Sequence, residues 1–321
     1  MALEQPASDA DIRALYRTVL KREAESDAVV RNYTDANIPL GDALATFLTC
    51  PEFVERNVPA AGAAIWQARQ PGAIETEATD AQLSAMRAHV EKVWSAYGEE
   101  QTYWSVLTAD KYRDAALDAA ALADFYASGF GTYDQIARLL VRNNVAAGRI
   151  RSVLDFGCGV GRLAAPFVQH FGDYIGVDIS PGHLRLARER AVASGLGAAE
   201  FLLMGDFLRS DIAYDLYYSL IVLQHNPPPI MREMLRAGLQ RVRPGGYALF
   251  QIPAMIFDYN FSVERYLAGG WRDSMEMHAL PQRAVFAELA DAGFRLLEIV
   301  PDPFIGPAGI SYVYLAEKMA A

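Results

Sequence analysis

Cysteine is scarce in this sequence: Cys50 and Cys158 are the only two in 321 residues. Two cysteines cannot build the disulfide framework of a small secreted domain, so their number favours a reducing compartment. The first 20 residues, MALEQPASDADIRALYRTVL, also lack the basic segment and apolar stretch of a secretory signal. We therefore expect a cytoplasmic protein.

Long apolar runs and clusters of basic residues are missing as well. No stretch approaches the roughly 20 apolar residues that cross a bilayer, so we expect no membrane span. Acidic residues outnumber Lys and Arg by 39 to 29, which disfavours a nucleic-acid partner because phosphates need a basic face. The five histidines show no HExxH or CxxC spacing, so we expect no bound metal.

Amphipathic helices are predicted for residues 8–56. Ser8 or Asp9 can cap the first helix, whose apolar residues recur at helical spacing, and IPLGDALATFLTCPEF contains a second. The segments LYRTVLKRE (15–23) and FLTCPEF (47–53), with Asp27 between them, resemble a helical module of unknown function found beside glycan-processing domains in bacteria. Cys50 replaces the usual Ser, and the usual Pro-Asp after Arg-Glu is missing. The alternative is a small bundle that packs or dimerises.

Strands and helices alternate from residue 151 onward. Strands are predicted at RSVLDFG, DYIGVDIS, AEFLLMGDF, YDLYYSLIVLQH, YALFQIPA, FRLLEIVPD and ISYVYLAEK, with helices between most of them. Such alternation predicts an α/β fold in which helices cover both faces of a parallel sheet. Residues 57–80 are rich in Ala, Gly and Pro, as in a linker, and residues 80–147 are mostly helical in pattern.

The turn after the first of these strands is rich in glycine, in VLDFGCGVGRL. Gly157, Gly159 and Gly161 allow a sharp bend and close approach of a ligand. Asp178 follows roughly 20 residues later, where an acid accepts ribose hydroxyls. The third glycine comes one residue earlier than in the dinucleotide pattern, and Asp155 would repel a pyrophosphate. These features favour a nucleoside that carries an ammonium group.

Residues 151–319 resemble the class I S-adenosylmethionine-dependent methyltransferases. The resemblance rests on five motifs in order: VLDFGCGVGRL, YIGVDIS, MGDF, DLYYSLIVLQH and RVRPGGYALF. It implies a Rossmann-like sheet of seven strands, the last one antiparallel, and S-adenosylmethionine as cofactor. We therefore expect a helical accessory module at 1–58, a linker at 59–80, a helical cap at 81–148 and a cofactor-binding domain at 149–321.

The resemblance also implies roles for individual residues. Gly157, Gly159 and Gly161 shape the turn under the methionine part, and Asp155 orders that turn and the ammonium end. Asp178 holds the ribose and Ile179 packs against the adenine. Asp206 accepts from the adenine amino group, with Phe207 beside the ring. Cys158, as a small packing residue, and Leu223 complete the expected cofactor-binding set.

Two histidines are candidates for the general base of a methyl transfer to a hydroxyl. His225 follows the fourth strand, at the sheet edge where ligands bind, and histidine titrates near neutrality. The alternative is that it only shapes the pocket. His278 is the weaker candidate, since it also fits a loop or cap residue. The expected acceptor-binding residues are aromatic: Tyr103, Trp104, Tyr259, Tyr266 and Trp271.

The sequence therefore predicts a methyltransferase whose acceptor is a hydroxyl on a sugar or glycan precursor. That acceptor is suggested by the N-terminal resemblance and by the aromatic segment MIFDYNFSVERYLAGGWRDSMEMH, which is long enough to be a lid. The alternatives are a small-molecule O- or N-methyltransferase of secondary metabolism, and a catalytically silent binding subunit. The N-terminal helices could also support a homo-oligomer.

Overall fold

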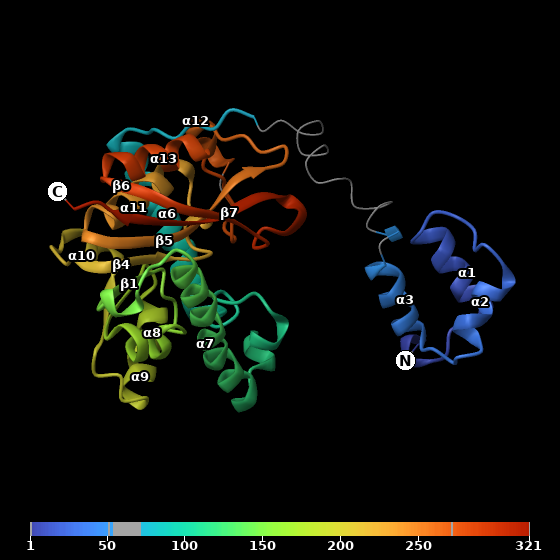
Figure 1. The fold of residues 1–321 in the computed structure, drawn as a ribbon. Coiled ribbons are helices and arrows are strands. Elements are labelled where there is room, and N and C mark those ends of the chain that lie inside the picture. The colour runs from blue at the N-terminus through green and yellow to red at the C-terminus, as the bar shows by residue number, and fades with distance from the viewer. Residues whose placement is uncertain (1, 51, 54–71, 271, 321) are drawn as a thin grey trace. The chain divides into compact units, whose positions relative to one another are not determined.

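The structure is a computed structural model that describes residues 2–50, 52–53, 72–270 and 272–320. The chain divides into two compact units, Met1–Gln70 and Pro71–Ala321. Figure 1 colours them from blue, for the first unit, to red at the end of the second. The predicted helical cap therefore lies in the same compact unit as the sheet, and most of the predicted linker lies outside the described residues.

The first unit is helical, as its pattern predicts. It contains a short 3-10 turn, η1 (Ala2–Glu4), and the helices α1 (Asp9–Thr18), α2 (Asp27–Thr34) and α3 (Leu40–Thr49). Ser8 caps α1 through a capping box with Asp11. The core joins all three helices through Ile12, Val30 and Phe47, which are at most 2% exposed. This unit thus has a small apolar core of its own.

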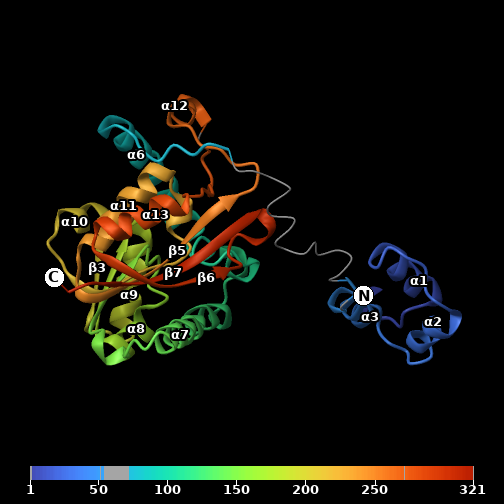
Figure 2. The same ribbon diagram turned by 45° about the horizontal axis from the view of Figure 1, so that its top comes forward.

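The second unit is built on one seven-stranded sheet. Its strands are β1 (Ser152–Phe156), β2 (Asp173–Asp178), β3 (Ala199–Leu203), β4 (Tyr214–Ser219), β5 (Val242–Ile256), β6 (Phe294–Asp302) and β7 (Gly309–Lys318). The order is β3-β2-β1-β4-β5-β7-β6, and β7 runs antiparallel to both β5 and β6 (Figure 2). The predicted fold class, with seven strands and an antiparallel last strand, is confirmed.

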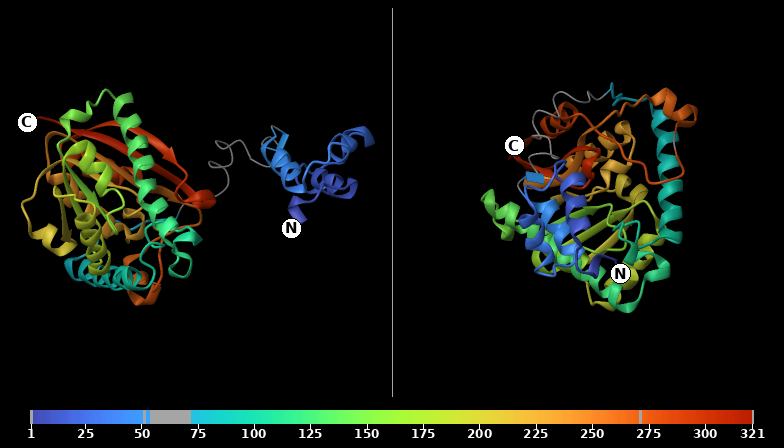
Figure 3. Two further views of the ribbon diagram at one scale, coloured as in Figure 1. Left: turned by 90° about the horizontal axis from the view of Figure 1, so that it is seen from below. Right: turned by 90° about the vertical axis from the view of Figure 1, so that its right-hand side faces the viewer.

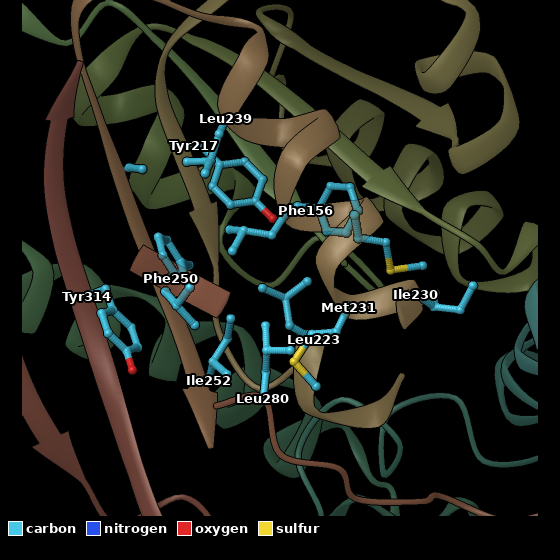
Figure 4. Packing of buried hydrophobic residues seen from close by; sticks show 14 of the residues in the cluster. Phe156, Tyr217, Leu223, Ile230, Met231, Leu239, Phe250, Ile252, Leu280 and Tyr314 are labelled. Carbon is cyan, nitrogen blue, oxygen red and sulfur yellow. The ribbon is translucent and has the colours of Figure 1, made fainter. Parts of the chain in front are cut away.

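Helices cover both faces of this sheet (Figure 1). One face carries α7 (Ala119–Arg142), α8 (Ala164–Phe171) and α9 (Pro181–Ala193), which share a buried apolar cluster with the strands. The other carries α6 (Asp80–Glu100), α10 (Met204–Arg209), α11 (Pro228–Gln240) and α13 (Gln282–Asp291). Figure 4 shows the second cluster, in which Phe156, Tyr217 and Phe250 meet Met231 of α11. Both apolar faces of the sheet are thereby removed from water.

Two connections bring non-sheet segments to the carboxyl edge of the strands. α6 packs against α9 and α11, and Figure 3 shows it in teal along one side of the sheet. Residues 101–118, with the short turns η2 (Asp110–Tyr112) and η3 (Asp114–Ala116), link α6 to α7. Between β5 and α13 the chain forms α12 (Val263–Arg265), a π-helical turn at Tyr266–Gly270, and then an irregular stretch. The remaining 3-10 turns are η4 (Ala147–Arg149), η5 (Leu223–His225) and η7 (Gly306–Ala308).

Three predicted elements have different limits in the structure. The third strand ends at Leu203, and α10 begins at Met204. Met204 and Phe207, three residues apart, are both buried, which is the spacing of a helical turn. The fourth strand ends at Ser219 and is followed by η5. The fifth strand, predicted from Tyr247, already begins at Val242, and its pairing with β4 shifts register between Tyr214 and Leu216.

Among the described residues, no helix is long and apolar enough to cross a membrane. Over the same part of the chain, no group of three or more His, Cys, Asp or Glu side chains could hold a metal ion.

Candidate functional site

A cavity opens at the carboxyl ends of β1, β2 and β4. It has a volume of about 930 Å³, which includes space open to solvent. The loop after β1, the end of β2 and the loop after β4 form its floor, and α6 and residues 105–107 form its cover. Ligands bind at this edge of doubly wound sheets because the strand order reverses between β1 and β4, which leaves a crevice there.

The glycine-rich turn forms one wall of this cavity. Gly157, Gly159 and Gly161 have φ angles of 80°, 54° and 72°, a left-handed region that glycine adopts without strain. A Cβ on Gly157 would lie 2.4 Å from the side chain of Val222, and one on Gly159 would lie 2.6 Å from that of Val106. Glycine is therefore required at both positions by conformation and by space.

Asp155 lies beneath this turn and lines the cavity. It is 4% exposed, and its Oδ2 accepts a hydrogen bond of 2.7 Å from the hydroxyl of Tyr174. Burial raises the pKa of Asp155 to about 7, against the opposing effects of the Tyr174 hydroxyl and the Arg162 guanidinium. A buried carboxylate that is this costly to ionise suits a cationic ligand group.

Asp178 ties the end of β2 to two neighbouring segments. Its Oδ2 accepts the backbone N–H of Gly159 at 2.8 Å, and its Oδ1 accepts that of Ser180 at 2.9 Å. Each carboxylate oxygen keeps a second lone pair for a ligand hydroxyl. Asp178 and the neighbouring Ile179 both line the cavity, as their predicted roles require.

His183, which was not among the predicted site residues, also lines the cavity. Its Nε2 lies 3.0 Å from the Ser105 hydroxyl and 3.2 Å from the Thr102 carbonyl, both in the segment after α6. Its Nδ1 is buried with no hydrogen-bond partner among the described residues and lies 3.6 Å from Oδ1 of Asp178. The sequence feature that could have identified His183 is its place as the third residue of the helix that follows Asp178.

The cover of the cavity is held against α9 by close backbone packing. A Cβ on Gly98 would lie 1.9 Å from the Ser180 hydroxyl, and one on Gly182 would lie 2.7 Å from the Gly98 carbonyl. This contact lets α6 approach the first turn of α9. The next residues of the chain, including Val106, then reach the glycine-rich turn.

Two other residues of the cavity lining, Tyr218 at the end of β4 and Asn226 after η5, each carry a buried polar atom with no hydrogen-bond partner among the described residues. These atoms are the Tyr218 hydroxyl and Oδ1 of Asn226. Both side chains are at most 4% exposed. Buried polar atoms are usually satisfied, so these atoms are suited to contact a bound ligand. Neither residue could be recognised from sequence, because Tyr218 stands among apolar strand residues and Asn226 stands before three prolines, a context typical of an ordinary turn.

The other predicted cofactor residues lie at different depths. Cys158 lines the cavity, and burial raises the pKa of its thiol, as befits a packing residue. Phe207 and Leu223 are fully buried in the apolar core and do not line the cavity; Figure 4 shows Leu223 there. Asp206 is exposed on α10, where it forms an ion pair of 2.7 Å with Arg209, and it lines a neighbouring hollow with Ile179.

The candidate base His225 lies beside the cavity and is 7% exposed. Its ring is 5.3 Å from that of Trp94, which does line the cavity. Its Nδ1 lies 2.7 Å from the Glu276 carbonyl, and its Nε2 lies 3.3 Å from the amide nitrogen of Gln224. Burial lowers the pKa of His225 to about 4.

The second candidate, His278, belongs to a separate hollow, which we call the aromatic chamber. Its lining includes Tyr259, Phe261, Tyr266, Glu276 and His278. Nδ1 of His278 lies 2.8 Å from the Tyr259 hydroxyl, and the Glu276 carboxylate accepts a hydrogen bond of 2.7 Å from Tyr266. Of the predicted acceptor-binding residues, this chamber therefore contains Tyr259 and Tyr266.

The remaining predicted acceptor-binding residues lie elsewhere. The ring of Tyr103 packs edge-on against Phe125 at 5.2 Å, and the guanidinium of Arg113 lies 4.2 Å from the centre of the Trp104 ring. Neither Tyr103 nor Trp104 lines the cavity or the aromatic chamber. Trp271 lies outside the described residues.

Comparison with known proteins agrees with this geometry. Residues 153–246 match the family model of a methyltransferase domain. A solved magnesium protoporphyrin IX methyltransferase from Synechocystis PCC 6803, with bound SAH, shares the fold. It has a TM-score of 0.51 and 18% identity, and the match covers 72% of this chain and 99% of that one. The chain thus contains a methyltransferase domain at residues 153–246 and shares the fold of a methyltransferase solved with bound SAH.

Curated relatives are more similar in sequence over a shorter region. The ubiquinone biosynthesis O-methyltransferase of Bordetella avium (strain 197N) is 32% identical over 102 residues, which are 31% of this chain and 42% of the relative. The protein of the same name from Aliivibrio fischeri (strain ATCC 700601 / ES114) is 30% identical over 116 residues, 35% and 49% of the two chains. This chain spans less than half the length of these relatives.

Proposed function

We propose that this protein transfers the methyl group of S-adenosylmethionine to a hydroxyl group of a small acceptor. The observation that carries the proposal is the cavity in which Asp155 and Asp178 flank the glycine-rich turn. The names of the curated relatives support oxygen as the acceptor atom. S-adenosylmethionine supplies an electrophilic methyl on a sulfonium, and the protein mainly aligns the two partners and excludes water.

Within this cavity the chain's own residues bind the cofactor in parts. Gly157, Cys158, Gly159 and Gly161 shape the wall under the methionine part, and Asp155 beneath that wall accepts from the ammonium. Asp178 accepts from the ribose hydroxyls through its unused lone pairs, and Ile179 packs against the adenine. Asp206, Phe207 and Leu223 remain proposed cofactor residues. Phe207 and Leu223 are buried in the core, so they pack behind the residues that would contact the adenine and do not contact it themselves.

We further propose a sugar or glycan precursor as the acceptor. Tyrosine rings beside a carboxylate that accepts hydrogen bonds, as in the aromatic chamber, suit a polyhydroxylated ring. A small-molecule O- or N-acceptor of secondary metabolism is the alternative, and a catalytically silent binding subunit is the rival from another class. The cytoplasm remains the proposed location, and assembly through the N-terminal helices remains the proposed oligomeric contact.

Transfer of a labelled methyl group tests this proposal. The full chain is incubated with methyl-labelled S-adenosylmethionine and with nucleotide sugars, glycan fragments, phenols or amines in separate reactions. Label in a sugar hydroxyl supports the preferred acceptor, and label in a phenol or amine supports the small-molecule alternative. If the protein binds the cofactor but methylates none of these acceptor classes, the hypothesis of a catalytically silent binding subunit replaces that of an enzyme.

A further inference from the structure

A chain of buried amide groups runs beside the cavity, from β5 to residues 272–278. The backbone N–H of Ile221 donates to Oε1 of Gln251 at 3.1 Å, and Nε2 of Gln251 donates to Oε1 of Gln224 at 2.9 Å. The amide nitrogen of Gln224 lies 3.3 Å from Nε2 of His225, whose Nδ1 lies 2.7 Å from the Glu276 carbonyl. Gln251, Gln224 and His225 are 0%, 1% and 7% exposed.

Backbone groups at both ends fix the direction of every hydrogen bond in this chain. The Ile221 N–H can only donate, so Gln251 presents its oxygen there and turns its NH₂ group toward Gln224. The Glu276 carbonyl can only accept, so Nδ1 of His225 carries the proton. Nε2 of His225 then carries a lone pair, which accepts a hydrogen bond from the Gln224 amide. The assignment of the amide and ring atoms follows from this network.

This arrangement holds the His225 ring neutral. A proton on Nε2 would face the NH₂ group of Gln224, and burial acts in the same direction by lowering the pKa of His225 to about 4. The titratable groups nearby are His278, which also lowers that pKa, and Glu276. The Glu276 carboxylate is hydrogen-bonded to Tyr266 and His278. Glu276 contacts His225 only through its backbone carbonyl oxygen. Trp94 of α6 packs against the ring from the cavity side.

The same network holds a strained piece of the cavity wall. Ile221 lines the cavity with a φ angle of 58°, a left-handed conformation that is costly for a β-branched residue. Its N–H is held by Gln251, and the next residue, Val222, packs against Gly157. Asn226, whose Oδ1 has no hydrogen-bond partner in the described part of the chain, follows directly after His225. The Gln224 carbonyl also accepts the N–H of His278 at 2.7 Å.

We propose that Gln251, Gln224 and His225 form a positioning relay that keeps the imidazole neutral and fixes the 220–226 wall of the cavity. His225 is then a positioning residue and does not take the proton of the acceptor. The inference depends on the proposed methyl transfer only for its activity readout. The protonation state of the ring can be measured without an acceptor.

Histidine NMR tests the relay directly. The full chain, labelled with ¹³C and ¹⁵N in its histidines and saturated with S-adenosylhomocysteine, is titrated from pH 5 to 8, and His225→Asn assigns the signal. We expect a neutral ring protonated at Nδ1 throughout this range. In Gln224→Glu a carboxylate faces Nε2, and the pKa should rise by about 1–3 units. The exposed His170 on α8 is the internal control. A wild-type His225 that titrates near 6.5, or that carries its proton on Nε2, would overturn the relay.

The pH dependence of turnover separates a positioning role from a base. With an acceptor found by the labelling screen, Gln224→Glu should lower kcat by about tenfold or more but leave the midpoint of the pH–rate profile unchanged. Gln251→Leu should lower kcat in the same way. Gln251→Glu should not restore it, because a carboxylate can accept the Ile221 N–H but cannot donate to Oε1 of Gln224. A midpoint that follows the pKa of His225 measured by NMR would identify His225 as the base. Absence of turnover with every acceptor would contradict the proposed function, while the NMR result would still decide the relay.

Discussion

Asp155 carries an unfavourable charge at its buried position in the wall of the cavity. Its pKa is raised from 3.8 to about 7, so its contribution to stability is present below pH 4 and is lost as the pH rises through 7. Asp155→Asn removes the charge and can still accept from Tyr174. We expect the variant to be more stable than the wild type at pH 8, by up to a few kcal/mol, and equal to it near pH 4. Thermal unfolding at the two pH values measures the difference.

The same substitution should weaken cofactor binding, because Asn offers no negative charge to the ammonium. Calorimetric titration at pH 8 is expected to show a loss of affinity in the variant that becomes smaller at pH 5.5, where Asp155 is itself protonated. Equal affinities of wild type and variant at pH 8 would show that Asp155 does not contact a charged part of the ligand.

Gly157 and Gly159 of the glycine-rich turn leave no room for a side chain. Gly159→Ala adds a Cβ at a φ of 54° and within 2.6 Å of Val106, so we expect a loss of about 1–3 kcal/mol of stability and of most cofactor affinity. The matched control is Gly131→Ala in α7, an exposed helical position with open space around it. That variant should be neutral or slightly more stable. Chemical denaturation and calorimetric titration compare the two.

Among the elements around the cavity, α9 holds the cover through His183 as well as through the Gly98–Gly182 packing. His183 bonds Ser105 and Thr102 in the segment after α6, so His183→Ala should free residues 101–109 from α9. We expect faster hydrogen exchange in this segment and weaker binding of S-adenosylhomocysteine. Arg185→Ala, on the exposed side of α9, is the control. If His183→Ala leaves both the exchange and the affinity as they are, the cover is held by the Gly98–Gly182 packing alone.

The sequence predicts the elements of the fold better than their limits. Alternating apolar strands and capped helices identify all seven strands, because these signals are local. The helical turn at Met204–Arg209 was missed, because burial of Met204 and Phe207 in the core decides it. The opening of β5 was missed for the same kind of reason, since the sequence VRPGG favours a turn and its pairing with Tyr214 is a tertiary contact.

The residues of the candidate site likewise fall into those that the sequence identifies and those that only the fold reveals. The glycine-rich turn, Asp155 and Asp178 are visible in sequence because their roles follow from strand ends and spacing. His183, Tyr218 and Asn226 are visible only once the fold brings them to one cavity. The direction of the amide relay likewise depends on Gln251, a residue of β5 that is distant in sequence from Gln224.

At the scale of the whole molecule, the two compact units have separate apolar cores. All residues that line the cavity belong to the second unit. We therefore expect a chain that begins at residue 72 to bind S-adenosylhomocysteine with the affinity of the full protein. Calorimetric titration of both chains makes the comparison, and circular dichroism confirms that the shorter one is folded. A folded short chain with much lower affinity would mean that the first unit takes part in binding.

The most direct test of the proposed cofactor site is the binding of S-adenosylhomocysteine to the full chain, measured by isothermal titration calorimetry with wild type, Asp178→Ala and the exposed control Asp134→Ala. We predict one ligand per chain and an unchanged affinity for Asp134→Ala. Asp178→Ala should lose about tenfold or more in affinity, because hydrogen bonds to a carboxylate are worth roughly 1.5–3 kcal/mol. Absence of binding to the wild type at millimolar ligand, or equal affinity in Asp178→Ala, would contradict the proposed site.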